Sequence, residues 1–175
     1  SDDNGLVLPP KLAPVQVAIV PIAKNEEQLN ALRAYVQPML DGLRAKGITV
    51  KFDDDDKKKP GWKFAEYEFK GYPVRIAVGP RDMENGTVEV ARRDTLEKQV
   101  MQATDIAEKV EHLLAAIQDN LYQKALAMRE RYTRAVDSYD DFKVAIEEGG
   151  FILAQWDGPA ETEARVKEET KATIR

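Results

Sequence analysis

The chain has 175 residues, enough for one generous domain or for one domain and a small second one. Hydrophobic residues make up 43% of it and charged residues 33%, which excludes collagen-like and wholly disordered proteins. A formal net charge of −5 argues against a generic nucleic-acid binder coated in basic charge, and the absence of cysteine excludes disulfides, thiolate metal sites and a cysteine nucleophile.

The first fifty residues predict a strand, a helix and a second strand. Val15–Val20 is a short, nearly continuous apolar run, typical of a strand buried on both faces. Asn25 predicts the cap of a helix whose apolar residues recur at helical spacing until Gly47, with a kink or break at Pro38. Ile48–Phe52 predicts the second strand. Short connections between these elements favour parallel pairing, so we expect an α/β fold.

The middle of the chain alternates charged and aromatic segments. Asp53–Lys59 predicts a solvated, mobile loop; its Asp-Asp-Asp-Asp-Lys string resembles the enteropeptidase cleavage site, but we interpret it as a native charged loop. Trp62–Lys70 fits either a short helix or an irregular aromatic turn. Val74–Val78 and Thr87–Ala91 predict two antiparallel strands, joined through the turn residues Gly79–Asp82.

The last third is mostly helical in pattern. Thr104 predicts the cap of a long amphipathic helix that breaks near Asn120. Another helix is expected over Tyr139–Glu148 and a last strand over Phe151–Trp156. Ala160–Thr173 predicts a charged helix with little apolar face and no partner.

No motif for catalysis or metal binding was found. His112 is the only histidine, and a lone histidine makes neither a metal site nor a catalytic triad. No Gly-rich phosphate loop accompanies any strand, and the acidic loop lacks the spaced ligands of an EF-hand. No apolar run approaches the roughly 20 residues that a membrane span needs, so we expect a soluble protein without membrane contact.

The segment most informative about function carries the positive charge. Residues 57–98 hold 10 basic and 7 acidic side chains, whereas the segments before and after it are both net acidic. Aromatic rings alternate there with acids and bases, a combination that proteins use to stack and read unpaired RNA bases. Alternatively, Trp62, Tyr67 and Phe69 simply cover the edge of the sheet.

Four motifs occur together in a known order. They are Leu6-Val7-Leu8-Pro9-Pro10-Lys11-Leu12-Ala13-Pro14, the Gly-Trp-Lys-Phe element at Gly61–Arg75, Gly79-Pro80-Arg81-Asp82, and Arg92-Arg93-Asp94-Thr95. Through these motifs the whole chain resembles the C-terminal portion of prolyl-tRNA synthetases of the archaeal/eukaryotic-like type. Prolyl-tRNA synthetases are class IIa aminoacyl-tRNA synthetases. Ser1-Asp2-Asp3-Asn4 lacks Met and a leader, so we interpret the start as a cut within a longer chain.

The resemblance implies three parts. Residues 1–14 would be the tail of a catalytic domain. Residues 15–120 would be an anticodon-binding domain, a mixed five-stranded sheet flanked by helices. Residues 121–175 would be a truncated, partial α+β C-terminal domain that lacks its zinc-binding cysteines. The parent would be a cytoplasmic homodimer that uses ATP, Mg and zinc to attach proline to tRNA(Pro), while this fragment alone would be non-catalytic, with no cofactor or metal.

The resemblance also implies which residues bind tRNA. Proline anticodons share two guanines, whose edges offer two N–H donors beside one carbonyl acceptor, so a carboxylate and a cation match them. Expected anticodon-binding residues are Phe64 for stacking, Glu68, Arg75 and Lys98 for one guanine, and Asp82 for the second. Expected phosphate contacts are Lys63, Arg81, Arg92 and Arg93.

The residue pattern raises two alternative functions. A structural or dimer-stabilising module would pack its aromatic segment on a neighbouring subunit instead of reading RNA. A flavodoxin-like small-molecule enzyme is disfavoured, because no phosphate cradle or catalytic pair accompanies the strands.

Overall fold

The structure is a computed structural model and describes all 175 residues. It divides into two compact units, residues 1–121 and residues 122–175. The division falls within one long helix, α4 (Ile106–Tyr132), which continues without the break expected near Asn120. This helix begins two residues after the expected cap, Thr104.

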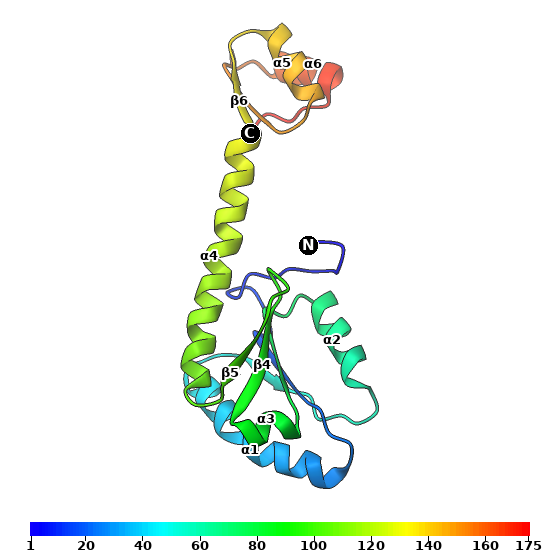
Figure 1. Ribbon diagram of the computed structural model, residues 1–175. Helices are drawn as coiled ribbons and strands as arrows, with labels where there is room; N and C mark the ends of the chain where they lie inside the picture. The colour runs from blue at the N-terminus through cyan, green and yellow to red at the C-terminus, as the bar shows by residue number, and fades with distance from the viewer. The chain divides into compact units, whose positions relative to one another are not determined.

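The first unit contains a mixed five-stranded sheet with the strand order β2-β1-β3-β4-β5 (Figure 1). β1 is parallel to both β2 and β3, whereas β4 is antiparallel to β3 and β5, so the predicted pairings and the α/β class are confirmed. The strands are β1 (Val17–Pro21), β2 (Val50–Phe52), β3 (Val74–Val78), β4 (Thr87–Arg92) and β5 (Lys98–Gln102).

The strand β5 is the one that the residue pattern missed. Its sequence, KQVMQ, contains only two apolar side chains, because β5 lies at the edge of the sheet and most of it is exposed. An edge strand with few buried positions lacks the alternation by which strands are found. A five-stranded sheet was expected only from the resemblance, since the fifth strand of the residue pattern, Phe151–Trp156, corresponds to β7 of the second unit.

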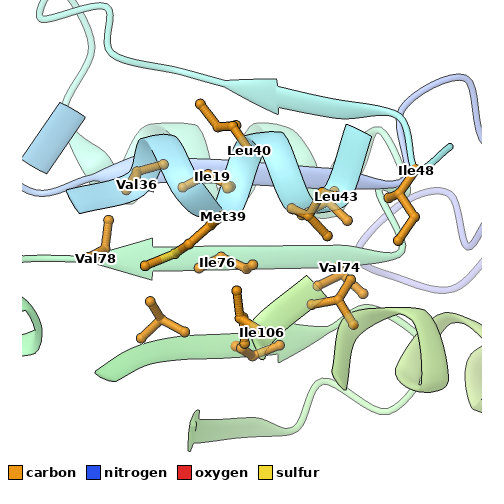
Figure 2. Close-up of a cluster of buried hydrophobic side chains, with 14 of the residues drawn as sticks. Ile19, Val36, Met39, Leu40, Leu43, Ile48, Val74, Ile76, Val78 and Ile106 are labelled. Atoms are coloured by element: carbon orange, nitrogen blue, oxygen red, sulfur yellow. The ribbon is translucent and has the colours of Figure 1, made fainter. Parts of the chain in front are cut away.

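The main core lies between one face of the sheet and two helices, α1 (Glu26–Ala45) and α4. Asn25 caps α1 as predicted, since its Oδ1 accepts a hydrogen bond from the amide of Gln28 at 2.9 Å. The helix runs through Pro38 without interruption. Figure 2 shows its apolar stripe, including Val36, Met39 and Leu43, packed on the strand residues beneath it.

The helix α2 (Pro60–Phe69) covers part of the opposite face of the sheet, away from α4 (Figure 1). Its buried Tyr67 packs on Ala18 and Val20 of β1. The Trp62–Lys70 segment is therefore a helix rather than an irregular turn. Since α2 covers only the β1 side, side chains of β4 and β5 on this face stay partly exposed.

The acidic loop is held to the fold at its beginning, so its first two carboxylates are not simply solvated as expected, while residues 55–59 are exposed. The carboxylate of Asp53 accepts hydrogen bonds from the Tyr67 hydroxyl and pairs with Lys63 at 3.2 Å. Asp54 pairs with Arg33 of α1 at 2.9 Å. Charge alone predicted solvation, but these cations and the phenol supply internal partners.

The Gly79–Asp82 segment starts a short helix, α3 (Pro80–Asn85), rather than a simple turn. Asp82 stabilises its start because its Oδ2 accepts from the amide of Gly79 at 2.9 Å. Gly86 ends the helix in the left-handed region at φ 66°, which a residue without a Cβ adopts without strain.

The second unit contains two parallel strands, β6 (Thr133–Val136) and β7 (Phe151–Ala154), and two helices, α5 (Tyr139–Glu147) and α6 (Ala160–Thr170). The expectation that α6 has no partner is wrong. Its Val166 is buried, and its Glu169 accepts a hydrogen bond from the Tyr139 hydroxyl of α5 at 2.9 Å. A single buried valine and long polar side chains give α6 contacts that its weak apolar pattern did not predict.

Candidate nucleic-acid interface

Two cations and a small residue form a row across the sheet on the face that carries α2. Arg75 of β3 is paired with Ala91 of β4, and Ala91 is paired with Lys98 of β5. Paired residues on neighbouring strands point to the same side of a sheet, and the strands lie about 4.8 Å apart. The methyl group of Ala91 therefore leaves a hollow between two larger basic side chains.

This hollow collects most of the expected anticodon-binding residues. Its volume is about 20 Å³, enough for roughly one water molecule and too small to admit a whole base. The edge of a base could meet only the groups at its mouth. It is lined by Tyr67, Glu68, Tyr72, Arg75, Ala91, Arg92, Arg93, Leu96 and Lys98.

Arg75 is the most unusual residue of the hollow. It is only 4% exposed, and its Nη1 atom makes no hydrogen bond. The nearest carboxylate oxygen, on Glu89, lies 3.7 Å from Nη1, which is too long for a hydrogen bond. Burial lowers the pKa of the guanidinium, against the opposing effect of Glu89 and Glu68. A buried, charged N–H group without a hydrogen bond is rare in folded proteins and needs an explanation.

Phe64 has a different position from the one expected for a free stacking ring. The guanidinium carbon of Arg75 lies 3.7 Å from the centre of the Phe64 ring, so one face of that ring is already covered. This contact holds Arg75 in place through a cation–π attraction. Phe64 therefore orients the arginine, and only the rest of its surface is left for a base.

Glu68 lies on α2 at the edge of the hollow and is half-buried. Its negative charge acts on the two neighbouring guanidinium groups, those of Arg75 and Arg93. Its backbone oxygen accepts a hydrogen bond from Arg93 Nε at 2.9 Å, which fixes this turn of the helix. Thus the structure brings Glu68, Arg75 and Lys98 around one hollow.

The structure does not bring Asp82 to the same place. Asp82 follows the carboxyl end of β3, whereas Arg75 lies near its beginning, so about 10 Å of strand separates the two regions. One carboxylate oxygen of Asp82 already caps α3. The other oxygen has only a 3.5 Å contact with the hydroxyl of Thr87.

Two of the four expected phosphate contacts are buried. Lys63 is 3% exposed, and its ammonium group donates to the Asp53 backbone oxygen at 2.8 Å. Arg93 is 4% exposed and forms a two-pronged pair with the carboxylate of Asp2, at 2.7 and 2.6 Å. Both cations have partners inside the fold, so the expected phosphate contact does not fit their positions.

The other two expected phosphate contacts differ in availability. Arg81 is exposed on α3. Arg92 is half-buried and donates to both carboxylate oxygens of Asp94, at 2.8 and 2.7 Å. Because Asp94 also accepts from Asn120 of α4, Arg92 belongs to a bonded cluster that ties the β4–β5 turn to that helix.

Sequence reasoning missed Tyr72, Ala91 and Leu96, which also line the hollow. Tyr72 stacks on Tyr67 with ring centres 4.8 Å apart and forms one wall. Ala91 matters only through its position between two cations. Strand pairing could have revealed Ala91 if β5 had been recognised, but no local signal distinguishes Leu96.

A larger cavity, of about 660 Å³, lies within the second unit and contains none of the expected site residues. Its walls include Tyr139, Phe142 and Trp156, beside the carboxylates of Asp137 and Asp157. Acidic groups beside apolar rings do not favour an RNA backbone.

The chain offers no group of three or more histidine, cysteine, aspartate or glutamate side chains that could hold a metal ion. His112 is exposed on α4. The donor set therefore does not fit the zinc site that the resemblance implies for the parent. No helix is both long and apolar enough to cross a membrane.

The chain is similar to curated proteins along its whole length. Over all 175 residues the chain is 62% identical to a protein named proline–tRNA ligase from Porphyromonas gingivalis, and it covers 36% of that protein. It is 61% identical to a protein of the same name from Phocaeicola vulgatus and 59% identical to one from Bacteroides fragilis, covering 35% of each. The chain thus spans about a third of the length of these curated relatives.

Two protein families match separate parts of the chain. Residues 139–175 match the family described as "Prolyl-tRNA synthetase, C-terminal". Residues 16–113, which contain the whole sheet and the hollow, match the family described as "Anticodon binding domain". Because this second match covers more than half of the chain, the protein belongs to the anticodon-binding domain family.

Proposed function

We propose that this chain is the anticodon-binding part of a proline–tRNA ligase and that its hollow reads a guanine of the proline anticodon. The family match supports binding to an anticodon, and the names of the relatives support the choice of proline tRNA. Residues 15–120 would form the anticodon-binding domain, and residues 121–175 part of a C-terminal domain.

One observation carries the proposal: Arg75 is buried and charged, has an Nη1 atom without a hydrogen bond, and lies beside the carboxylate of Glu68. Leaving a buried donor unpaired costs about 1–3 kcal/mol. A purely structural arginine would be expected to find an acceptor within the fold. A ligand with a carbonyl group would supply an acceptor to the guanidinium through the hollow, which Arg75 lines.

Guanine has the matching chemistry. Its Watson–Crick edge presents the O6 acceptor beside two N–H donors. Arg75 donates to O6, Glu68 accepts from the two N–H groups, and Lys98 adds positive charge at the opposite side of the mouth. Adenine reverses this pattern at its 6-position, because it has an amino donor where guanine has the acceptor.

The second guanine and the phosphates require other groups. Asp82 would read the second guanine through its Oδ1 atom, since Oδ2 already caps α3. Arg81 would contact phosphates, and Lys98 and the mostly buried Arg92 would add positive charge. This part of the binding would be independent of sequence and weakened by salt.

The activity of the longer protein is part of the proposal. The parent would use ATP, with Mg, to attach proline to tRNA(Pro), as a cytoplasmic homodimer of the archaeal/eukaryotic-like type. This chain would contribute tRNA recognition and no catalytic residue. Any zinc site would draw its ligands from outside these residues.

The proposal is tested by fluorescence anisotropy with a labelled anticodon stem–loop of proline tRNA and loops in which each guanine is replaced by adenine. The wild-type chain should prefer the guanine loop. Glu68→Gln should weaken binding to that loop about tenfold and reduce the preference, because the amide keeps one acceptor but introduces a misplaced donor. Glu66→Gln is the matched control, since Glu66 lies on the same helix but pairs with Lys70.

Thermal melting distinguishes the structural alternative. If Glu68 only balances the charges of Arg75 and Arg93, Glu68→Gln should lower the melting temperature and weaken all loops alike. A stable Glu68→Gln protein with an unchanged guanine preference would refute the proposed role. Equal and weak binding of every loop by the wild-type chain would favour the structural or dimer-stabilising alternative.

A further inference from the structure

Leu96 combines three properties that the fold itself does not require. It lies in the turn between β4 and β5, and its backbone φ is 62°, within the left-handed region. Side chains with a Cβ adopt this region only at a cost, and glycine or asparagine is the usual choice. Three non-glycine residues of the chain have positive φ, and Leu96 is the apolar one among them.

The core does not explain the leucine. Its side chain is 45% exposed, and it belongs to neither of the two hydrophobic clusters. The turn is closed by backbone hydrogen bonds, from the amide of Leu96 to the carbonyl of Arg92 and from the amide of Arg92 to the carbonyl of Glu97. A glycine would make the same bonds without strain.

The position of Leu96 suggests what the side chain does. It lines the hollow together with Arg75 and Lys98, and Tyr72 lines it as well. The hollow is too small for a base, so a bound base must leave most of its flat surface outside. Since one face of the Phe64 ring is covered by Arg75, another apolar group is needed to cover that surface.

We propose that Leu96 is a base-contacting residue that packs against the flat face of the guanine whose edge Arg75 and Glu68 bind. The inference rests on the function proposed above and adds a residue to it. An apolar contact with the face of a base is insensitive to the identity of the base, because every base has such a face. Leu96 therefore contributes to affinity, while the polar groups decide specificity.

Two substitutions separate this role from a structural one. Leu96→Ala keeps the Cβ, and with it the backbone strain, but removes the side-chain contact with the base. Leu96→Gly removes both the strain and the contact. The glycine variant should melt at a higher temperature than the alanine variant. Both should bind the guanine stem–loop about tenfold more weakly than the wild-type chain, with the ratio of guanine to adenine binding unchanged.

The matched control is Leu153→Ala, which removes an exposed leucine from β7 of the second unit and should leave binding unchanged. Wild-type affinity in both Leu96 variants would overturn the inference. So would affinities that follow the melting temperatures, with the glycine variant binding better than the alanine variant. If the wild-type chain itself fails to prefer guanine, the proposed function fails first, and the role of Leu96 fails with it.

Discussion

Replacing Arg75 with methionine separates the energetic cost of burying a cation from its use in binding. Methionine has a similar length and is compatible with an apolar site. Removing the unpaired Nη1 donor should stabilise the fold by about 1–3 kcal/mol. Two losses oppose this gain: the contact with the Phe64 ring, about 0.5–2 kcal/mol, and the 3.7 Å pair with the half-exposed Glu89, at most about 1 kcal/mol.

These terms nearly cancel, so the free energy of unfolding of Arg75→Met should stay within about 2 kcal/mol of the wild-type value. Binding should respond differently. Without the donor to O6, affinity for the guanine stem–loop should fall by about 1–3 kcal/mol, or roughly 5- to 150-fold, and the preference over adenine should disappear. Urea unfolding measures the first quantity and fluorescence anisotropy the second.

Arg44→Met is the matched control, since it removes an equal charge from an exposed position on α1, on the other side of the sheet. Arg44→Met should leave the free energy of unfolding and the affinity for the guanine stem–loop nearly unchanged. If Arg75 were chiefly a structural residue, its removal should destabilise the fold by more than the roughly 3 kcal/mol that its contacts with Phe64 and Glu89 together supply. Such a loss, or unchanged guanine preference in a stable Arg75→Met protein, would refute the reasoning.

Three further outcomes follow from the contacts of the site. Lys63→Met should lower the free energy of unfolding by about 3 kcal/mol, because it leaves the half-buried Asp53 carboxylate without its cation. The salt dependence of RNA binding should not change, and a flattened salt dependence in a stable protein would contradict this. The hydrogen bond from Arg93 lowers the pKa of Asp2 from 3.8 to about 2. The ionised Asp2 therefore stabilises the folded state fully above pH 3.8, and this stabilisation is lost as the pH falls through about 2. Urea midpoints measured across this range should depend less on pH in Asp2→Asn than in the wild-type chain. Ala91→Leu should fill the hollow and weaken stem–loop binding at least about tenfold while costing about 1 kcal/mol of stability, and unchanged anisotropy titrations would show that the hollow is not used.

Much of the fold could be predicted because its signals are local. The buried strand Val17–Pro21 consists of consecutive apolar residues, and α1 has both a cap at Asn25 and an apolar stripe. Such patterns follow from the geometry of strands and helices, so they are visible before any contact is known. The edge strand β5 and the helix α6 bury few side chains, and their patterns were correspondingly weak.

The site depends on a different kind of information. The residue types in residues 57–98 indicated a binding surface for RNA, and the family resemblance named the residues. Neither could show that Lys63 and Arg93 are buried in ion pairs, since a lysine or arginine has the same appearance in a sequence whether it faces water or a carboxylate.

The tertiary structure alone decided which residues meet. Arg75, Ala91 and Lys98 become neighbours through strand pairing, and Glu68 reaches them because α2 packs across the sheet. Asp82 is close to Arg75 along the chain but is separated from it by the length of a strand. Burial, pairing and strain, such as the positive φ of Leu96, are properties of the packed chain, because each depends on atoms contributed by residues far apart in the sequence.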